Sequence, residues 1–338
     1  MINLSVDAMG GDHGLDATVP ASVKVVEKYP DIKIILVGDP EGIRSRLGAH
    51  VDHDRLEVQP ASEVVEMEDA PSYALRKKKD SSMRVAINLV KSGDANACIS
   101  AGNTGALMAT ARFVLKTIPG IERPAICAAL PKLNGFTYML DLGANIDSPP
   151  EMLFQFGLMG SRLISCLDGS ENPSVGLLNI GVEEMKGNET IKAAAEIFKN
   201  SGLNYRGFVE PNEIYLGDTD LIVCDGFVGN IALKASEGVA QMIMSTLKEE
   251  FTRSLVTKAC GIFASPVLDS VKTRLDHRRY NGASLLGLRG TVVKSHGGTD
   301  HVGFQHAIEV AIEEVRKNLV NEIENSLTAM PVQDTLAQ

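Results

Sequence analysis

Short apolar runs recur along the chain, and all but one of the eight end at a glycine, an aspartate or an asparagine. Near-continuous hydrophobicity over about four to eight residues is typical of a strand that is buried on both faces of a sheet. We therefore expect buried strands within residues 2–11, 32–39, 96–105, 124–130, 136–145, 175–181, 220–230 and 290–298.

Segments with apolar residues at helical spacing lie between these runs, at 81–93, 148–167, 189–202 and 302–325. The second of them opens with Ser148, Pro149 and Glu151, which is the pattern of a capping box with proline at the first helical position. Alternating strands and helices predict a three-layer α/β/α fold around a mostly parallel sheet. We expect residues 1–338 to form a single α/β/α unit, or two interlocked subdomains.

The alternation stops between Asn230 and Asp276, where the sequence contains no strand candidate. A long helix is predicted from Asn230, and a second helix is predicted from Ser265 and Pro266. The apolar segment 256–266 between them contains a single charged residue, Lys258. Residues 230–276 are therefore predicted to form a protruding helical hairpin with an apolar tip. The apolar stripe of the first helix contains Val239, Met242, Ile243, Leu247, Phe251 and Leu255.

The overall charge and the cysteine pattern exclude several classes of protein. The 338 residues include 33 basic and 43 acidic side chains, and the net charge of −10 argues against a general nucleic-acid binder. The five cysteines form no CxxC pair and lie mostly in apolar runs, which favours buried thiols in a reducing cytoplasm. The N-terminus has the pattern of a strand rather than of a signal peptide, and no stretch approaches the ~20 apolar residues of a membrane span.

Polar, glycine-bearing loops follow six of the predicted strands, at residues 7–14, 100–105, 141–145, 179–188, 225–230 and 294–298. In a doubly wound sheet, ligands bind beyond the carboxyl ends of the strands, so we expect these loops to gather at one edge. Glycines that precede a helix expose backbone N–H groups, and the helix dipole favours an anion there. The alternative for any single loop is that its glycines only form a tight turn.

The candidate residues for binding phosphate or substrate lie in these loops. Lys186 is predicted to hold a cation at the mouth of the site, although a lysine in a solvated loop is the simpler interpretation. The other candidates for phosphate or substrate binding are Asp7, Gly10, Gly11, Gly102, Asn103, Thr104, Gly105, Asn145, Asp225 and His296.

Several familiar catalytic motifs are missing from the sequence. It contains no GxxxxGK[ST], no GxGxxG, no GxSxG and no HExxH, and the histidines have no ligand spacing, so we expect neither a metal nor a cofactor. Cys224 lies in an apolar strand, and an inert core thiol is favoured there over an acyl-accepting nucleophile.

The loops and their flanking segments closely resemble the bacterial phosphate acyltransferases of the PlsX type. The resemblance is full-length and rests on "DAMGGDHG", "SMRVA", "SAGNTGALM", "GIERPA", "LDLGAN", "LLNIGVEEMKGNE", "VCDGFVGN" and "YNGASLLGLRGTVVKSHG". It implies a fold like that of the isocitrate and isopropylmalate dehydrogenases and the phosphotransacetylases. It also implies a homodimer that makes acyl phosphate from acyl-acyl-carrier-protein and inorganic phosphate. The implied setting is phospholipid synthesis in the cytoplasm at the inner face of the plasma membrane, with a glycerol-3-phosphate acyltransferase downstream.

In that reaction a phosphate oxygen attacks a thioester carbonyl, and the protein has to position the anion and stabilise the oxyanion. We expect Lys186 to supply a point charge and Asn230 to be a neutral donor, and we expect His13 or His296 to carry a proton to the leaving thiolate. The alternative for either histidine is a hydrogen bond within its own loop and no role in proton transfer. Asp7 and Asp225 orient donors or cap the loops that follow them.

Two basic clusters stand against the acidic background, at residues 76–79 and at Lys272, Arg274, Arg278 and Arg279. The first is predicted to be a solvated face, and the second to attract an acidic carrier protein or anionic lipid. Leu255, Ile262 and Phe263 are predicted to contact the membrane, with Lys258 among the headgroups. The competing interpretation is that the hairpin forms a dimer interface. The two interpretations are compatible if the stem forms the dimer and the tip contacts lipid.

Three rival functions remain open from the sequence. The first is a phosphotransacetylase-like transfer from acyl-CoA to phosphate. The second is a β-decarboxylating dehydrogenase, for which we find neither the metal-binding aspartates nor the arginine cluster. The third is a non-catalytic scaffold, which would need no phosphate-binding loops.

Overall fold

The computed structural model describes residues 1–275 and 277–329, apart from the side chains at 269, 272–275, 277, 279 and 329. In this part of the chain eleven strands form one sheet, in the order β3-β2-β1-β4-β11-β10-β5-β6-β9-β7-β8. The strands are β1 (Ile2–Asp7), β2 (Ile32–Gly38), β3 (Leu56–Pro60), β4 (Ala97–Ser100), β5 (Ala125–Pro131), β6 (Phe136–Leu140), β7 (Ser174–Leu178), β8 (Asn204–Val209), β9 (Leu221–Val223), β10 (Ala283–Leu286) and β11 (Thr291–Lys294).

The sheet reverses direction near its middle. Strands β3, β2, β1, β4 and β11 are parallel to one another, and so are β6, β9, β7 and β8. Between these two groups, β10 pairs antiparallel with β11 and with β5, and β5 pairs antiparallel with β6. The second group therefore runs opposite to the first. The prediction of a mostly parallel sheet is confirmed, but the six polar loops lie three at each end of the strands rather than at a single edge.

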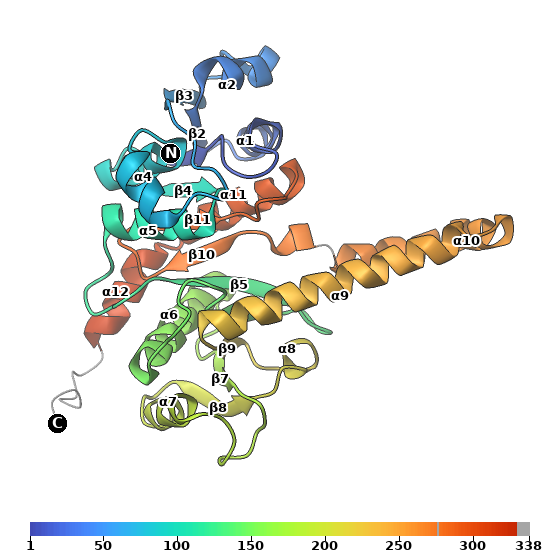
Figure 1. Cartoon of the computed structure of the whole chain (residues 1–338). Coiled ribbons are helices and arrows are strands. Elements are labelled where there is room, and N and C mark those ends of the chain that lie inside the picture. Colours follow the sequence, from blue (N-terminus) through green and yellow to red (C-terminus); the bar gives the residue numbers. More distant parts are fainter. Residues whose placement is uncertain (276, 330–338) are drawn as a thin grey trace.

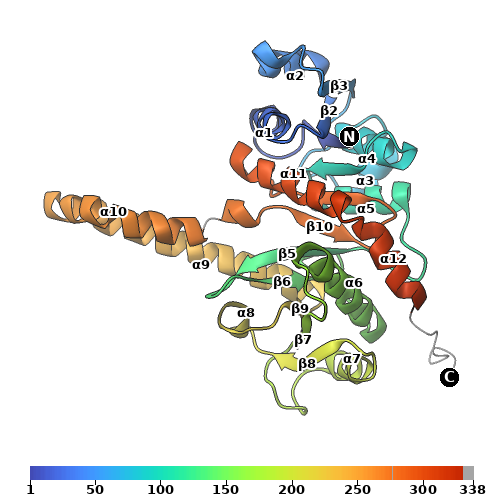
Figure 2. The same cartoon turned by 180° about the vertical axis from the view of Figure 1, so that it is seen from behind.

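Helices cover both faces of the sheet, which confirms the three-layer α/β/α prediction. One face carries α1 (Leu15–Lys28), α2 (Pro40–Leu47), α6 (Pro150–Asp168), α7 (Glu189–Lys199), α11 (His301–Arg316) and α12 (Leu319–Ala329), and Figure 2 shows most of them from outside. The other face carries α3 (Pro71–Lys77), α4 (Ser82–Ser92), α5 (Thr104–Leu115), α8 (Glu213–Leu216) and α9 (Gly226–Thr252) (Figure 1). Short 3-10 helices lie at Gly48–His50 and His277–Tyr280.

The helix signals in the sequence are partly confirmed. Helix α4 begins after Ser81, whose hydroxyl accepts from the Arg84 N–H at 3.3 Å, and it ends at Gly93 with φ of 84°. The capping box predicted at Ser148 is wrong. Helix α6 begins after Pro149, and the buried Ser148 hydroxyl has no hydrogen-bond partner within the described part of the chain.

One long helix predicted at 302–325 is also wrong, because the chain breaks there into α11 and α12. Asn318 adopts φ of 54° at the break, a left-handed conformation that asparagine tolerates better than most residues. The prediction missed three strands as well. Two of them, β3 and β8, are the edges of the sheet, and their sequences mix polar and apolar residues, since an edge strand is not buried on both sides.

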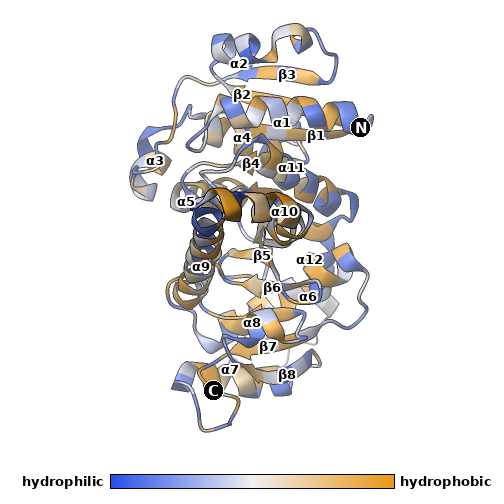
Figure 3. Ribbon diagram, turned by 90° about the vertical axis from the view of Figure 1, so that its right-hand side faces the viewer, coloured by the Kyte–Doolittle hydropathy of each residue, from blue (hydrophilic) through white to orange (hydrophobic). Residues whose placement is uncertain are grey.

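The helical hairpin extends away from the body of the molecule, as predicted (Figures 1 and 2), and Figure 3 shows it end-on. Its second helix is α10 (Leu255–Leu275), which starts at Leu255 rather than at Ser265 and includes Pro266. Ser254 accounts for this start, since its hydroxyl accepts from the Thr257 N–H at 3.1 Å and so caps the first turn. The apolar segment 256–266 is therefore helical. No helix in the described ranges combines the length and the apolar character that crossing a membrane requires.

Candidate active site

Asp7 organises the loops at one end of the strands. Its buried carboxylate accepts from the hydroxyls of Ser82 and Ser100, both at 2.6 Å, and the Ser100 hydroxyl accepts from the Gly102 N–H at 3.1 Å. Burial raises the pKa of Asp7, and hydrogen bonds from the two serines and from the backbone of the following loop oppose that rise. Asp7 thus orients neighbouring donors, one of the two roles expected for it.

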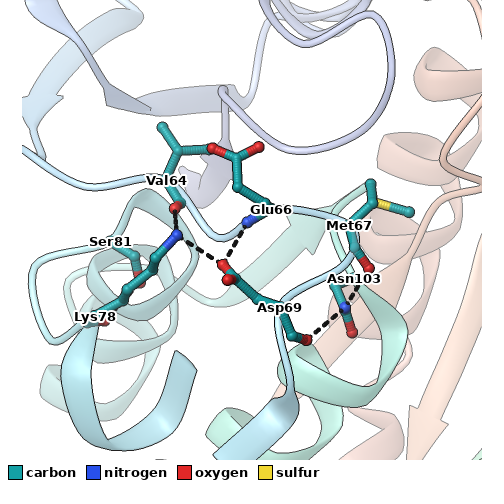
Figure 4. A network of polar contacts seen from close by, with 7 residues as sticks. All are labelled: Val64, Glu66, Met67, Asp69, Lys78, Ser81 and Asn103. Carbon is teal, nitrogen blue, oxygen red and sulfur yellow. Dashed lines mark hydrogen bonds and ion pairs between the residues drawn. The ribbon is translucent and has the colours of Figure 1, made fainter. Parts of the chain in front are cut away.

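Asn103 fastens a neighbouring segment instead of pointing a free amide outward. Its Oδ1 accepts from the Ala106 N–H at 3.0 Å and caps α5. Its Nδ2 donates to the carbonyls of Met67, at 2.6 Å, and of Asp69, at 3.1 Å (Figure 4). Both amide protons of the side chain are therefore used within the protein.

Lys78 holds the same segment from the other side. Its Nζ lies 2.6 Å from the Asp69 carboxylate and donates to the Val64 carbonyl at 2.5 Å (Figure 4). The side chain is only 17% exposed. The prediction that the basic run 76–79 is a solvated face is wrong for this lysine, since it ties down the segment that carries Met67.

The loops at the opposite end of the strands pack tightly against one another. Asn145 is buried, and its Nδ2 donates to the Pro124 carbonyl and to the Asp141 carboxylate, both at 2.9 Å. Asp225 caps α9 by accepting from the Val228 N–H at 2.8 Å, one of the two roles expected for it. The side-chain donors of Asn145, like those of Asn103, are consumed by the fold.

Lys186 lies at this same end, because its loop follows β7, and β7 runs parallel to β9 and β6. The loop is held by Asn179, whose Nδ2 donates to the Lys186 carbonyl at 3.2 Å. The Lys186 side chain is exposed, and within the described residues its ammonium has neither an ion pair nor a hydrogen bond. His13, at the other end of the strands, is also exposed.

A groove of about 850 Å³ runs over the sheet between these two sets of loops. Apolar residues from β5 form its floor, Leu233 and Ala240 from α9 form one wall, and Leu142 closes one end. Polar and apolar residues together line the rest. Among the predicted site residues, the groove brings together Thr104, Asn230 and His296, whereas Lys186 and His13 do not line it. The floor residues are Ile126, Ala128 and Leu130.

Sequence reasoning missed Lys294, the last residue of β11, which lines the groove although it is only 8% exposed. The sequence did contain a signal for it, namely a lysine at the end of a strand that is otherwise mostly apolar. His296 lies two residues further on, and its Nδ1 accepts from the Gly298 N–H at 3.1 Å. Its backbone N–H donates to Asn281 at 2.8 Å, so the ring is set in place by its own loop.

The cysteines offer no activated thiol in the core. Burial raises the pKa of the Cys224 thiol well above its usual range, as expected for an inert core residue. Cys260 departs from the prediction of buried thiols, since it is exposed on α10. In the second basic cluster, Arg278 lies 2.9 Å from the Asp300 carboxylate, and the side chains of Lys272, Arg274 and Arg279 lie outside the described residues.

Comparisons with known proteins agree with this architecture. Residues 2–322 match the family described as "Fatty acid synthesis protein". A phosphate acyltransferase of Legionella pneumophila is 56% identical over 329 residues, 96% of each chain. A phosphate acyltransferase of Alcanivorax borkumensis is 57% identical over 330 residues, 97% of this chain and 98% of its own. A phosphotransacetylase from Streptococcus pyogenes shares the fold, with a TM-score of 0.65 at 15% identity and 94% of each chain covered. The chain therefore belongs to the phosphate acyltransferase family.

Proposed function

We propose that the protein transfers a fatty acyl group from acyl-acyl-carrier-protein to inorganic phosphate and so makes acyl phosphate for phospholipid synthesis. The observation that carries this proposal is the groove, which has an apolar floor and a polar, cationic end. Its volume falls in the usual range of small-molecule sites, about 300–1,000 Å³. The apolar part suits an acyl chain, and the polar part suits phosphate and the reacting thioester.

The chemistry needs positioning more than a strong base, because phosphate is already anionic near neutral pH. A phosphate oxygen forms a bond to the thioester carbon, the carbon–sulfur bond breaks, and the leaving thiolate takes up a proton. Backbone N–H groups of glycine loops suit an oxyanion that develops on the carbonyl. Asn230 lines the groove and is our candidate side-chain donor. His296 also lines it, which supports His296 over His13 as the proton carrier.

We retain Lys186 as a catalytic residue in this proposal. Its ammonium, which has no partner within the described residues, lies on the loop beside the one that leads into Asn230, since β7 and β9 are neighbours. Lys186→Ala is expected to lower turnover by at least about tenfold, the loss of one charge-assisted hydrogen bond in the transition state. Lys192→Ala, which removes a partly exposed lysine of α7 that pairs with Glu189, is the control. Near-normal turnover of folded Lys186→Ala at saturating phosphate would contradict this role.

Transfer from acyl-CoA is the second candidate, because the fold is that of a phosphotransacetylase. The two candidates differ in the donor alone. Thiol release is to be measured with acyl-carrier protein and with acyl-CoA, each with and without phosphate. Phosphate-dependent release from the carrier protein at the lower KM supports our proposal, and release from acyl-CoA alone supports the second candidate.

The hairpin is proposed to attach the protein peripherally to the inner face of the plasma membrane, close to a glycerol-3-phosphate acyltransferase that consumes its product. Leu255, Ile262 and Phe263 are 87%, 74% and 87% exposed, and their spacing puts them on one stripe of α10. Lys258 lies on the same stripe, where its ammonium would contact the lipid headgroups.

Vesicle flotation with anionic lipid tests this attachment. Leu255→Glu combined with Phe263→Glu is expected to release the protein from vesicles while activity on soluble substrate stays. Gln241→Glu with Ser245→Glu makes the same change in charge at exposed positions of α9 and is the matched control. Vesicle binding that survives the α10 changes would rule out the tip.

We also propose that the stem of the hairpin forms a homodimer. Val239, Met242 and Ile243 on α9 are exposed, apolar and spaced along one face of the helix. Light scattering should give twice the chain mass, and Met242→Glu should halve it. A Met242→Glu protein that keeps the dimer mass would place the interface elsewhere.

A further inference from the structure

Lys294 is a buried cation with a fixed position in the groove. Its Nζ donates to the carbonyls of Ala101, at 3.2 Å, and of Ser295. An ammonium has three N–H donors, so one remains, and Lys294 has no other partner within the described part of the chain. Burial lowers the pKa of Lys294 to about 8, while Asp7 and Asp12 act to raise it. Keeping the Lys294 ammonium charged at such a buried position costs free energy unless an anion binds beside it.

A second lysine lines the same groove from the opposite element. Lys234 belongs to α9, it lines the groove, and its charge acts to lower the pKa of Lys294. The two ammonium groups therefore lie within electrostatic reach of each other. Glu237, one turn along α9, is 3.7 Å from Lys234 and is itself partly exposed. The two ammonium groups repel each other across the groove, and an anion bound between them would offset that repulsion.

A small residue beside Lys294 gives a ligand access to a backbone N–H group. Gly297 lines the groove directly after His296, whereas the Gly298 N–H is already bonded to His296 Nδ1, and Thr104 lies at the first position of α5. Asp12 also lines the groove, and its carboxylate lies near Gly298, where it can accept a hydrogen bond from a protonated oxygen of a ligand. These groups match a small tetrahedral oxyanion better than a carboxylate or an apolar group.

We propose that Lys294 and Lys234 bind the attacking inorganic phosphate in the groove, with Lys294 as its rigid anchor. This inference rests on the proposed function and adds to it the place of the nucleophile. Phosphate bound here lies at the polar end of the groove, beside the apolar floor that holds the acyl chain. Lys186 then acts on turnover, whereas Lys294 and Lys234 act on the affinity for phosphate.

Steady-state kinetics of Lys294→Met and Lys294→Arg test the anchor. Lys294→Met keeps the length of the side chain without its charge, so we expect the KM for phosphate to rise at least about tenfold, with a smaller change in kcat and none in the KM of the acyl donor. Lys294→Arg restores a cation and should recover part of the loss. Lys234→Met should raise the same KM by less, because that lysine already has Glu237 as a partner. Lys33→Met removes a lysine that pairs with Glu57 outside the groove and is the control.

A binding measurement without turnover separates this inference from the proposed function. Phosphate should raise the melting temperature of the wild-type protein more than chloride does at equal ionic strength, and Lys294→Met should lose that difference. If the wild type binds phosphate through Lys294 but makes no acyl phosphate, the proposed function fails and the anchor stands. A folded Lys294→Met protein with unchanged phosphate KM and unchanged phosphate-dependent melting overturns the anchor. A rise in the acyl-donor KM alone also overturns it, because Lys294 would then hold the phosphodiester of the carrier's prosthetic arm.

Discussion

Ala128 on the floor of the groove gives the sharpest test of where the acyl chain lies. It belongs to β5, lines the groove and is half-buried between Ile126 and Leu130 along the strand. Ala128→Leu adds three carbons to the floor and should displace about three methylene groups of a long chain. At about 0.8 kcal/mol for each buried methylene, the loss is about 2.4 kcal/mol, or roughly 50-fold in kcat/KM. Chains too short to reach Ala128 should lose nothing.

The measurement is kcat/KM for a series of saturated acyl donors from short to long, with wild type, Ala128→Leu and Ala235→Leu. Ala235 is exposed on α9 and does not line the groove, so its substitution adds the same carbons without filling the site. The ratio of long-chain to short-chain kcat/KM is unaffected by a change in the folded fraction. An equal ratio for wild type and a folded Ala128→Leu protein would refute the placement of the chain over β5.

Two further predictions concern the stability of the framework around the groove. A Cβ at Gly229 would overlap the Asp141 carbonyl oxygen, so Gly229→Ala should lower the free energy of unfolding by about 3 kcal/mol or more in urea titrations, and a neutral effect would show that α9 shifts freely. Burial raises the pKa of Glu314, which is bonded to Ser284, from an ordinary 4.5 to about 7. The folded state then holds the proton that the unfolded state releases, so stability should fall by about 3 kcal/mol as the pH rises from 4.5 to 7. Glu314→Gln should flatten that part of the profile, and an unchanged slope would contradict the assignment.

The sequence predicted the layers of the fold better than the direction of its strands. Buried strands and amphipathic helices have periods that can be read from the residues, and the eight predicted strands all form. The reversal at β10 and β5 was not predictable, because an apolar run such as that of β5 looks the same in either direction. β10 was missed altogether, like the edge strands β3 and β8. The prediction that the six loops gather at one edge was wrong because of this reversal of strand direction alone.

The site was predictable to the level of loops but not of individual donors. Asn103 and Asn145 are residue types typical of ligand-binding sites, yet both donate their amide protons within the fold, to three backbone carbonyls and to the Asp141 carboxylate. Long-range contacts decide this, since the three carbonyls lie 21 to 36 residues away in the chain. Lys294 is the opposite case. In the sequence it is only the last residue of a strand, and the fold places it on the groove.

The hydrogen bonds of the two asparagines limit what can hold an anion in this site. Asn103 and Asn145 are committed to the framework, and Asp7 is enclosed by serines, so the groups that remain for an anion in the groove are backbone amides, Thr104, Asn230, His296 and lysines. Backbone amides are rigid, but each contributes only a partial charge. A dianion that enters a groove with an apolar floor loses water on one side, and full positive charges offset that loss most effectively. The fold meets this need by ending β11 with a lysine whose position two carbonyls fix, and only β10 separates it from the β5 floor on which the acyl chain is proposed to lie.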